Sequence, residues 1–288
     1  MTPTPENTLA GKVALITGAN TGIGRVTARE LARRGAHVFI ACRSAQRARP
    51  VVDEIRSLAP GSQVELLSLD LGDFASVRDC ARTFLARGLP LHLLINNAGV
   101  AGSRGLTASG FELAFGTNHM GHFLLTQLLL DTLKRSAPAR IVTVSSQAHY
   151  RCRGIDWAAQ RQSTQSTTGL PEYGVSKLAN ALFSAELGRR LAGSGVTTYA
   201  LHPGVVASDV WRSVPWPVRS LMKLMMISTE EGAATTLHCA TSPQVAQETG
   251  LYYDKCRVKA ASPLAQDAAL AAELWRRSES EEWLQAAA

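Results

Sequence analysis

The chain has 288 residues, of which 45% are hydrophobic and 18% are charged, and its net charge is +7. This composition allows one large folded α/β domain over residues 1–288 and excludes global disorder. The positive charge favours an anionic ligand such as a phosphorylated cofactor, an anionic membrane surface or nucleic acid. We expect no nucleic acid, because aromatic residues make up only 6% of the chain and the arginines are spread over predicted helices.

The cysteines and the N-terminus indicate a cytoplasmic protein. The five cysteines are odd in number and contain no Cys-x-x-Cys pair, so we expect reduced thiols and no zinc site. Residues 1–10 are polar, and no stretch of the chain approaches the ~20 apolar residues of a membrane span.

A strand, a glycine-rich turn and a helix are predicted near the N-terminus. Residues 12–17 (KVALIT) form the apolar, β-branched run of a buried strand, and helical periodicity covers residues 25–34. Glycines between such elements let the backbone approach a dinucleotide pyrophosphate, to which the helix N-terminus offers N–H groups. The spacing here is G-x-x-x-G-x-G. The residues expected to contact the cofactor are Gly18, Asn20, Thr21, Gly22, Ile23 and Gly24.

The end of the second predicted strand, residues 36–41, indicates which dinucleotide binds. A carboxylate at this position would bind the 2′-hydroxyl of NAD, but the chain has Arg43 and Ser44 there and no acid before Asp53. The guanidinium fork of Arg43 suits a 2′-phosphate, with Ser44 as a second donor. We therefore expect NADP rather than NAD. The alternative is that Arg43 is a solvated surface residue.

Two further strands are predicted at residues 63–69 and 91–95. The first ends at Asp70 and Leu71, and Asp70 would either lie over the adenine edge or cap the helix that begins near residue 73. The second runs into small residues that permit close approach of backbone to a cofactor. The cofactor contacts expected there are Asn97, Ala98 and Gly99.

One long helix is predicted over residues 108–135. Asn118 lies inside its apolar pattern and would be costly to bury without hydrogen bonds, so it is either a satisfied core amide or a site residue. His119 and His122 have no third ligand or carboxylate nearby in the pattern, so we expect them to pack rather than to bind metal.

The fifth predicted strand, residues 140–144, ends at Ser145 and Ser146. A polar stretch, 147–169, is typical of a loop or insertion beside a substrate site. A predicted helix then carries Tyr173 and Lys177, which lie one turn apart on the same face. A cation beside a phenol lowers the pKa of the phenol, and such a tyrosine can exchange protons with an alcohol or an alkoxide.

The last part of the chain contains strands at 196–201 and 250–253, a helix at 228–242 and a helical tail at 263–288. Residues 208–227 are interpreted as a substrate lid. Their methionine-rich part, 214–227, has two alternatives, which are membrane contact and ordinary core packing. The alternation of seven strands with helices predicts a Rossmann-type, doubly wound α/β domain with a mainly parallel seven-stranded sheet.

Together these motifs resemble the short-chain dehydrogenase/reductase family over residues 8–255. The family's motifs occur in its order, as Thr17-Gly18-x-x-x-Gly22-Ile23-Gly24, Asn96-Asn97-Ala98-Gly99, Asn118, Ser145-Ser146, Tyr173-x-x-x-Lys177 and Pro203-Gly204. Residues 118–123 (NHMGHF) and 177–180 (KLAN) are most similar to the retinol dehydrogenase branch.

The resemblance implies roles for four residues. Tyr173 would be the general acid/base, and Lys177 would lower the pKa of Tyr173 and hold the nicotinamide ribose. Ser146 would bind the substrate oxygen, and Asn118 would anchor a water that passes protons to Lys177. The cofactor would also contact Tyr173, Lys177, Pro203, Gly204, Val206 and Ser208.

The implied activity is hydride transfer between NADP(H) and a lipophilic alcohol, aldehyde or ketone, such as a retinoid. The alternative is a non-catalytic protein that senses NADP(H) with the same fold. By resemblance, the helices at 108–135 and 171–194 would form a homodimer or homotetramer. We expect a cytoplasmic location, with peripheral membrane contact through 214–227 as a further possibility.

Overall fold

The computed structural model describes residues 8–206 and 227–284. Within them, eight strands form one sheet in the order β3-β2-β1-β4-β5-β6-β7-β8. All neighbouring strands are parallel except β7 and β8. The strands are β1 (Val13–Thr17), β2 (His37–Cys42), β3 (Val64–Ser68), β4 (Leu93–Asn96), β5 (Ala139–Val144), β6 (Val196–His202), β7 (Leu251–Asp254) and β8 (Arg257–Val258).

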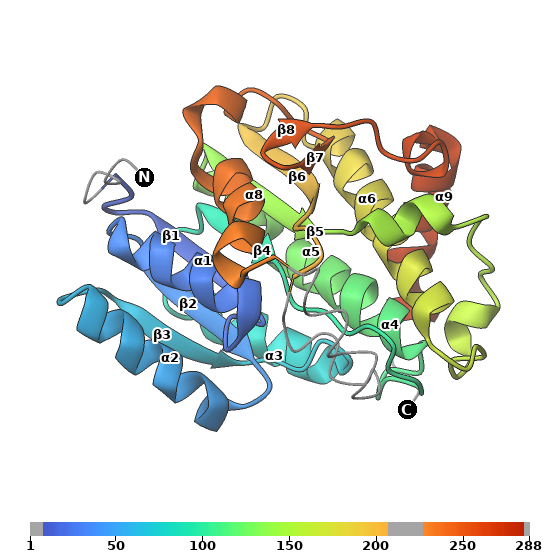
Figure 1. Ribbon diagram of the computed structural model, residues 1–288, viewed down its shortest axis with the longest axis horizontal. Helices are drawn as coiled ribbons and strands as arrows, with labels where there is room; N and C mark the ends of the chain where they lie inside the picture. The colour runs from blue at the N-terminus through green and yellow to red at the C-terminus, as the bar shows by residue number, and fades with distance from the viewer. Residues whose placement is uncertain (1–7, 207–226, 285–288) are drawn as a thin grey trace.

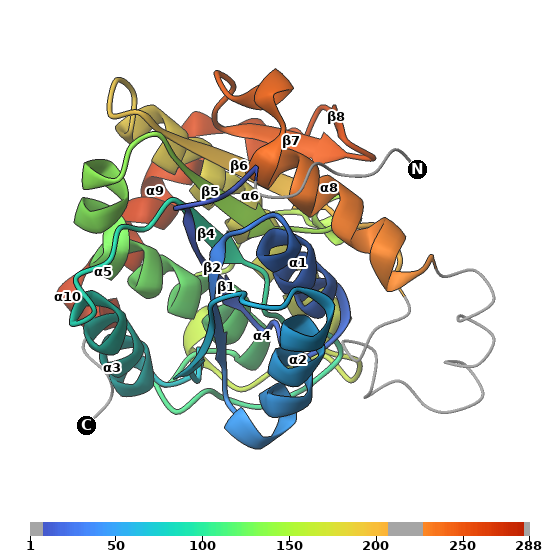
Figure 2. The same ribbon diagram turned by 90° about the vertical axis from the view of Figure 1, so that its left-hand side faces the viewer.

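Helices cover both faces of this sheet (Figures 1 and 2). One face carries α1 (Gly22–Arg33), α2 (Ala45–Leu58) and α8 (Thr229–Thr241). The other carries α3 (Phe74–Leu85), α5 (Gly121–Arg135), α6 (Leu170–Arg190) and α9 (Ala268–Ser278). The shorter helices are α4 (Leu113–Phe115), η1 (Gly116–Met120), η2 (Gln147–Arg151), η3 (Ala159–Arg161), η5 (Pro243–Val245), η6 (Leu264–Gln266) and α10 (Glu281–Leu284).

The strands are continuous apolar runs because both of their faces are buried. All five residues of β1 are buried, and the four apolar ones alternate between the two hydrophobic cores. Val13 and Leu15 join the core under α3, α5 and α6, whereas Ala14 and Ile16 join the core under α1, α2 and α8. This double coverage confirms the predicted doubly wound, mainly parallel sheet.

The sheet has eight strands rather than the predicted seven. The additional strand β8 has two residues and pairs with β7 in antiparallel fashion. Lys255 and Cys256 turn the chain between the two strands with φ of 51° and 60°. A strand of two residues is too short to leave a periodic pattern in the sequence, which is why it was not predicted.

The helix predicted over 108–135 begins later and is not uniform. Residues 106–112 form a turn instead, closed by a bridge between Leu106 and Glu112 and containing Gly110 at φ 74°. Helical structure starts with α4 and continues through the π-helix η1 into α5. The π-helix contains Asn118, and such segments often occur at functional sites.

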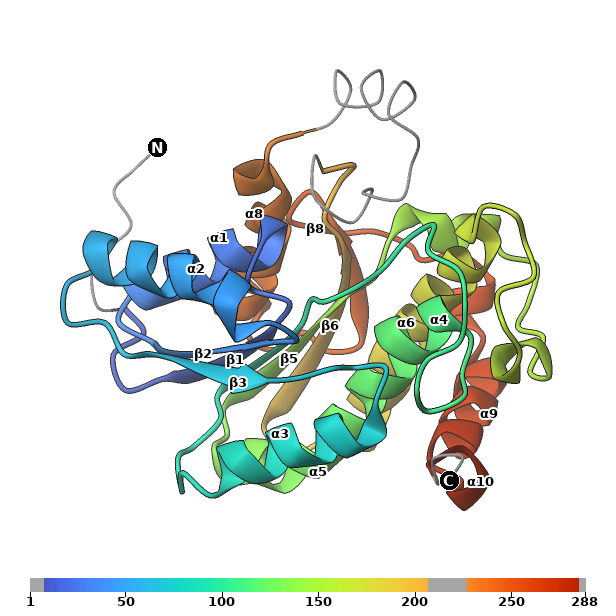
Figure 3. The ribbon, with the colours of Figure 1, turned by 90° about the horizontal axis from the view of Figure 1, so that it is seen from below.

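The C-terminal segment packs against the helices that carry the site residues (Figure 3). The Trp275 ring on α9 lies 5.1 Å from Phe123 and 6.0 Å from Phe183, between ring centroids. Trp283 on α10 lies 5.4 Å from Phe111. The tail therefore buries aromatic surface of α5 and α6.

Within residues 8–206 and 227–284, none of the helices has the length and apolar character that crossing a bilayer requires. The predicted lid, 208–227, lies outside the described residues apart from Ile227, and so does the rest of the methionine-rich segment 214–227.

Candidate active site

A cavity of about 1190 Å³ opens at the carboxyl ends of the strands. It lies where the strand order reverses between β1 and β4, which is the usual place for a ligand in a doubly wound sheet. Most of the predicted site residues line it: Gly18, Asn20, Thr21, Gly22, Ile23, Gly24, Arg43, Ser44, Asp70, Leu71, Asn97, Ala98, Gly99, Ser146, Tyr173, Lys177, Pro203, Gly204 and Val206. Asn118 does not line the cavity, and Ser208 lies outside the described residues.

The glycine turn after β1 packs tightly against the turn after β4. A Cβ on Gly24 would lie 2.5 Å from Nδ2 of Asn97, and one on Gly18 would lie 2.9 Å from Cα of Ala98. Gly18 also has φ 67°, which side chains disfavour. Glycine is therefore required at Gly18 and Gly24, and the first residues of α1, Gly22 to Gly24, line the cavity.

A buried network joins these two turns to the π-helix. Thr17 Oγ1 accepts from the backbone N–H groups of Asn97 and Ala98, each at 3.0 Å, and lies 2.8 Å from His122 Nε2. The other ring nitrogen of His122, Nδ1, lies 2.9 Å from the backbone oxygen of Asn118. Burial lowers the pKa of His122 to about 4, so the ring is neutral, donates from Nδ1 and accepts from Thr17. The sequence predicted only packing for this histidine.

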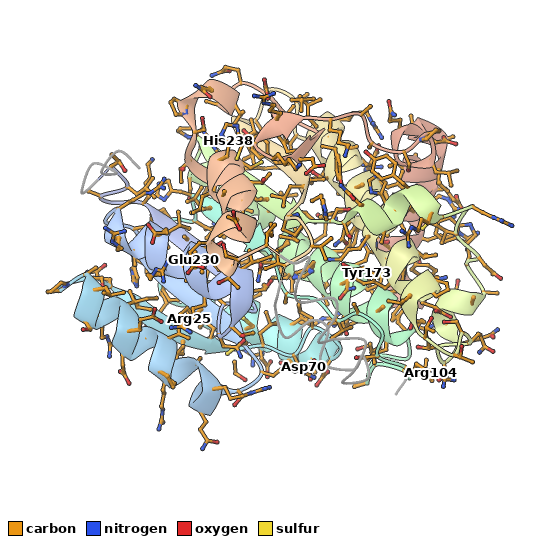
Figure 4. The ribbon with its side chains drawn as sticks, viewed as in Figure 1. Arg25, Asp70, Arg104, Tyr173, Glu230 and His238 are labelled. Carbon is orange, nitrogen blue, oxygen red and sulfur yellow. The ribbon has the colours of Figure 1, made fainter. Side chains whose placement is uncertain are left out.

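The end of the cavity near β2 and β3 is basic. Arg43 and Arg47 both line it, and Ser44 is the N-cap of α2, accepting from the backbone N–H of Arg47 at 3.3 Å. Asp73, not Asp70, caps α3. Asp70 instead accepts from the Gly72 backbone N–H at 2.9 Å and faces the cavity, which overturns the capping alternative (Figure 4).

Tyr173, Lys177 and Ser146 lie together on the other side of the cavity. Tyr173 is 9% exposed, and the Ser146 side chain lies close enough to its hydroxyl to act on the pKa of the phenol. Lys177 Nζ lies 5.6 Å from the centroid of the Tyr173 ring and donates to the Val144 backbone oxygen at 2.8 Å. Ser145 also lines the cavity, but its hydroxyl donates to the Lys177 backbone oxygen at 2.7 Å. The two serines therefore differ in their contacts, and the substrate-binding role of Ser146 stays a prediction.

Burial dominates the titration of this pair. It raises the pKa of Tyr173, against the opposing effect of the Ser146 side chain, and it lowers the pKa of Lys177 to about 7. The sequence predicted a lowered pKa for Tyr173, and this was wrong. A phenolate there would lose its hydration, and that cost exceeds the attraction of a lysine that is itself largely desolvated.

Asn118 is a fully bonded amide beneath the cavity floor. Its Nδ2 donates to the Val100 backbone oxygen at 3.0 Å and to Ser176 Oγ at 2.9 Å, and its Oδ1 accepts from the Val100 N–H at 2.8 Å. A Cβ on Gly99 would lie 3.3 Å from Asn118 Oδ1 and 3.5 Å from Lys177 Nζ. Asn118 is therefore both a satisfied core amide and a close neighbour of the lysine.

Residues that the sequence did not single out form the rim. The exposed rim is partly apolar, with Leu170 43% and Val205 46% exposed, and partly basic, with Arg151 and Arg153. Arg47 also lines the cavity. Its place one turn after Arg43 was the available signal, whereas the rim residues belong to no motif with a fixed spacing.

The arrangement can exchange a proton with an oxygen held between Ser146 and Tyr173. A phenol, a hydroxyl and an amine whose pKa is near neutral are general acid/base groups. Among the described residues, no group of three or more histidine, cysteine, aspartate or glutamate side chains is placed to bind a metal.

Comparison with known proteins gives a consistent picture. A family model described as short chain dehydrogenase matches residues 12–216. Retinol dehydrogenase 12 of Mus musculus is 47% identical over 278 residues, which cover 94% of this chain and 86% of that protein. A solved but uncharacterized protein from Mycobacterium Paratuberculosis has 35% identity and a TM-score of 0.76, covering 99% of this chain and 96% of that one. The Pseudomonas aeruginosa RhlG/NADP active-site complex has 27% identity and a TM-score of 0.68, covering 86% and 96%.

Proposed function

The chain belongs to the short-chain dehydrogenase family, in its retinol dehydrogenase branch, and is an oxidoreductase of alcohols and carbonyl compounds; from this premise we propose that it transfers hydride between NADP(H) and a lipophilic alcohol, aldehyde or ketone. The observation that carries the proposal is that Ser146, Tyr173 and Lys177 face the same cavity as the glycine turn. The residues that can transfer a proton and the turn that can bind a dinucleotide therefore line the same cavity.

The residues of the cavity fit NADP(H). The N-terminus of α1 and the glycine turn suit the pyrophosphate, and Arg43 and Arg47 suit a 2′-phosphate. Asp70 is the one acidic side chain among the described lining residues. When bound, the cofactor supplies or accepts hydride at its nicotinamide ring. The NADP complex of the related RhlG supports this choice over NAD.

We propose that Tyr173 donates the proton that the substrate oxygen receives during reduction. Its raised pKa keeps the phenol protonated at neutral pH, which suits donation to the oxygen of a carbonyl substrate during reduction. Ser146 holds the same oxygen through its hydroxyl. Lys177, with a pKa of about 7, can return a proton to Tyr173.

We propose that Asn118 anchors a water that passes protons to Lys177. An oxygen atom of Asn118 would accept the hydrogen bond from this water, because both hydrogens of the side-chain amide are already donated. Its neighbour His122 fixes the backbone oxygen of Asn118 in the π-helix.

Two observations support the proposal of a lipophilic substrate, which are the apolar residues at the rim and the names of the related proteins. Leu170 and Val205 are exposed where they meet the cavity, as expected of a surface that an apolar molecule covers. The related proteins are named retinol dehydrogenases. A retinoid-like carbonyl compound is therefore our first candidate.

The partners and the location inferred from the sequence stay predictions. These are a cytoplasmic location, membrane contact through 214–227, and a homodimer or homotetramer built on the helices at 108–135 and 171–194. In this chain, α9 already covers part of α5 and α6, so a dimer through those helices has less surface available.

The proposal is tested with Tyr173→Phe. NADPH oxidation is followed by absorbance with retinal, medium-chain aldehydes and apolar ketones, and we expect the variant to lose roughly 10²–10⁴-fold in kcat. NADPH binding, followed by fluorescence, should persist. The matched control is Tyr252→Phe, because Tyr252 is buried outside the cavity and its hydroxyl has no partner among the described residues. Full activity of Tyr173→Phe would contradict the proposed role.

A further inference from the structure

Two arginines at the substrate end of the cavity have no partner among the described residues. Arg151 and Arg153 both line it and both are exposed. Neither makes an ion pair or a side-chain hydrogen bond with any described residue, unlike arginines such as Arg25, Arg189 and Arg276, which pair with glutamates. Such a charge at the mouth of a cavity is available to a ligand.

The backbone that carries these arginines is held in place. His149 Nδ1 lies 2.6 Å from the Ser146 backbone oxygen, and its Nε2 accepts from the Ser262 N–H at 3.0 Å. Burial lowers the pKa of His149, which keeps the ring neutral and able to make both contacts. The Tyr150 hydroxyl donates to the Ala260 backbone oxygen at 2.5 Å. The segment is thus fixed to residues 260–262.

The same segment touches the helix that carries Tyr173. Cys152 lies between the two arginines, and its Sγ would be 3.2 Å from a Cβ placed on Gly174. Its backbone has φ −75° and ψ 147°, and the residues before and after it, Arg151 and Arg153, both line the cavity. Arg151 and Arg153 therefore flank a residue in contact with the neighbour of Tyr173.

Acidic residues near this end are already engaged. Asp254 forms an ion pair with Lys259 at 2.7 Å, and the carboxylate of Glu172 accepts from Ser166 N and Oγ at 2.8 and 2.5 Å. Asp156 accepts from the N–H groups of Ala158 and Ala159 at 3.0 and 3.2 Å. None of these acids lines the cavity, so none of them balances the charge of the two arginines within it.

We infer that the substrate carries an anionic oxygen acid, in first place a carboxylate, at the end opposite its reacting carbonyl. This inference rests on the proposed function and narrows its substrate class to amphiphilic oxo acids. The apolar rim contacts the chain of such a substrate, and the guanidinium forks of Arg151 and Arg153 bind its acid group.

A matched pair of substrates, 10-oxodecanoate and its methyl ester, tests this with the full chain and NADPH. We expect the acid to have a KM about tenfold below that of the ester, since charge-assisted hydrogen bonds at an exposed site give modest gains. In the double variant Arg151→Gln/Arg153→Gln, KM for the acid should rise by about the same factor, while KM for the ester stays constant. The control is Arg49→Gln/Arg104→Gln, because both arginines are exposed and neither lines the cavity; Arg104 is labelled in Figure 4.

Binding without turnover separates this inference from the proposed function. With the protein saturated with NADP⁺, calorimetry should show decanoate binding about tenfold more tightly than decanol, and the double variant should lose that difference. Decyl phosphate is measured in the same way, to show whether the site prefers a phosphate ester or a carboxylate. Tighter binding of either anion than of decanol supports the inference.

Equal binding of decanoate and decanol, together with equal KM for acid and ester, would overturn the anionic substrate and leave the oxidoreductase proposal intact. Tight decanoate binding without oxidation of any carbonyl in the panel would support the anionic site and contradict the proposed function. The affinity for NADP⁺ should be the same in wild type and double variant, which shows that the arginines do not act through the cofactor.

Discussion

At the scale of single residues, Lys177 shows most clearly that the site is built at the expense of stability. It is 3% exposed, and no described carboxylate pairs with it. Burial lowers its pKa from 10.5 to about 7, so the unfolded chain binds a proton that the folded chain releases. Folding is therefore opposed below pH 10.5, increasingly so as the pH falls to about 7.

Lys177→Met should accordingly stabilise the cofactor-free protein while it removes activity. Methionine fills the space without a charge, and we expect the free energy of unfolding at pH 7 to rise by on the order of 2 kcal/mol after the loss of the hydrogen bond to Val144. Urea unfolding followed by tryptophan fluorescence measures this, and kcat for NADPH oxidation should fall at least about 100-fold. A variant less stable than wild type at pH 7 would show that the burial cost of Lys177 is small.

Arg43→Asp tests whether Arg43 binds the 2′-phosphate and so sets the preference for NADPH over NADH. A carboxylate at this position repels the phosphate and can accept from a free ribose hydroxyl, so we expect the ratio of kcat/KM for NADPH over NADH to fall about 100-fold. Arg49→Asp, on the first turns of α2 but outside the cavity, serves as the charge-matched control. An unchanged ratio in Arg43→Asp would show that Arg43 is only a surface residue.

Sequence reasoning worked for residues that belong to a motif of fixed spacing. The glycines, Ser146, Tyr173 and Lys177 line one cavity because each follows a strand or lies one helical turn from another site residue. It did not find the rim arginines, whose approach to the cavity depends on contacts with residues 260–262. Nor did it give the sign of the pKa shift of Tyr173, which depends on burial.

At the scale of elements, the segment from η1 into α5 carries two buried histidines. His119 hydrogen-bonds Ser278 at 3.1 Å, and His122 bridges Thr17 and Asn118. Burial lowers the pKa of His119 to about 3 and that of His122 to about 4. The unfolded chain takes up these protons near pH 6.5, before the folded chain does, so stability is lost as the pH falls below 6.5.

We therefore expect the free energy of unfolding to fall between pH 6.5 and 5 by about 2 kcal/mol for each of these histidines. Urea titrations at pH 7.5, 6 and 5 measure the slope. In His122→Gln, the loss of stability between pH 6.5 and 5 should be smaller by about 2 kcal/mol, the contribution of one histidine. The variant should also be less stable than wild type at pH 7.5, because it loses part of the hydrogen-bond network. The same slope in both proteins would mean that His122 is protonated in the folded state.

The elements themselves were predictable where one pattern governs a whole segment. The seven longer strands were found within about two residues of their observed ends, because burial on both faces gives each a continuous apolar run. The helix predicted from residue 108 failed because Thr107 and Phe111 close a turn through a side-chain hydrogen bond of 3.1 Å. A π-helix follows from local backbone geometry that periodicity does not resolve.

At the scale of the whole molecule, the C-terminal tail acts as an intramolecular cover. Trp275 is 4% and Trp283 3% exposed, and they pack on aromatic side chains of the π-helix region, α5 and α6. Arg190 also lies over the Trp275 ring, with its guanidinium carbon 4.4 Å from the centroid. Without the tail, these helices would expose a contiguous apolar surface, which soluble proteins rarely leave uncovered.

Removing the anchor of this cover should therefore cost stability but not chemistry. We expect Trp275→Ala to lower the free energy of unfolding by about 3 kcal/mol, and Trp275→Phe by clearly less, because phenylalanine refills part of the cavity. Trp275 does not line the active-site cavity, so kcat per folded molecule should stay constant in both variants. A chain that ends at Ser262 lacks the whole tail and exposes the aromatic surface of α5 and α6. We expect it to self-associate, and light scattering should give it a larger mass than the full chain. A truncated chain with unchanged mass and stability would mean that the tail is not needed to cover these helices.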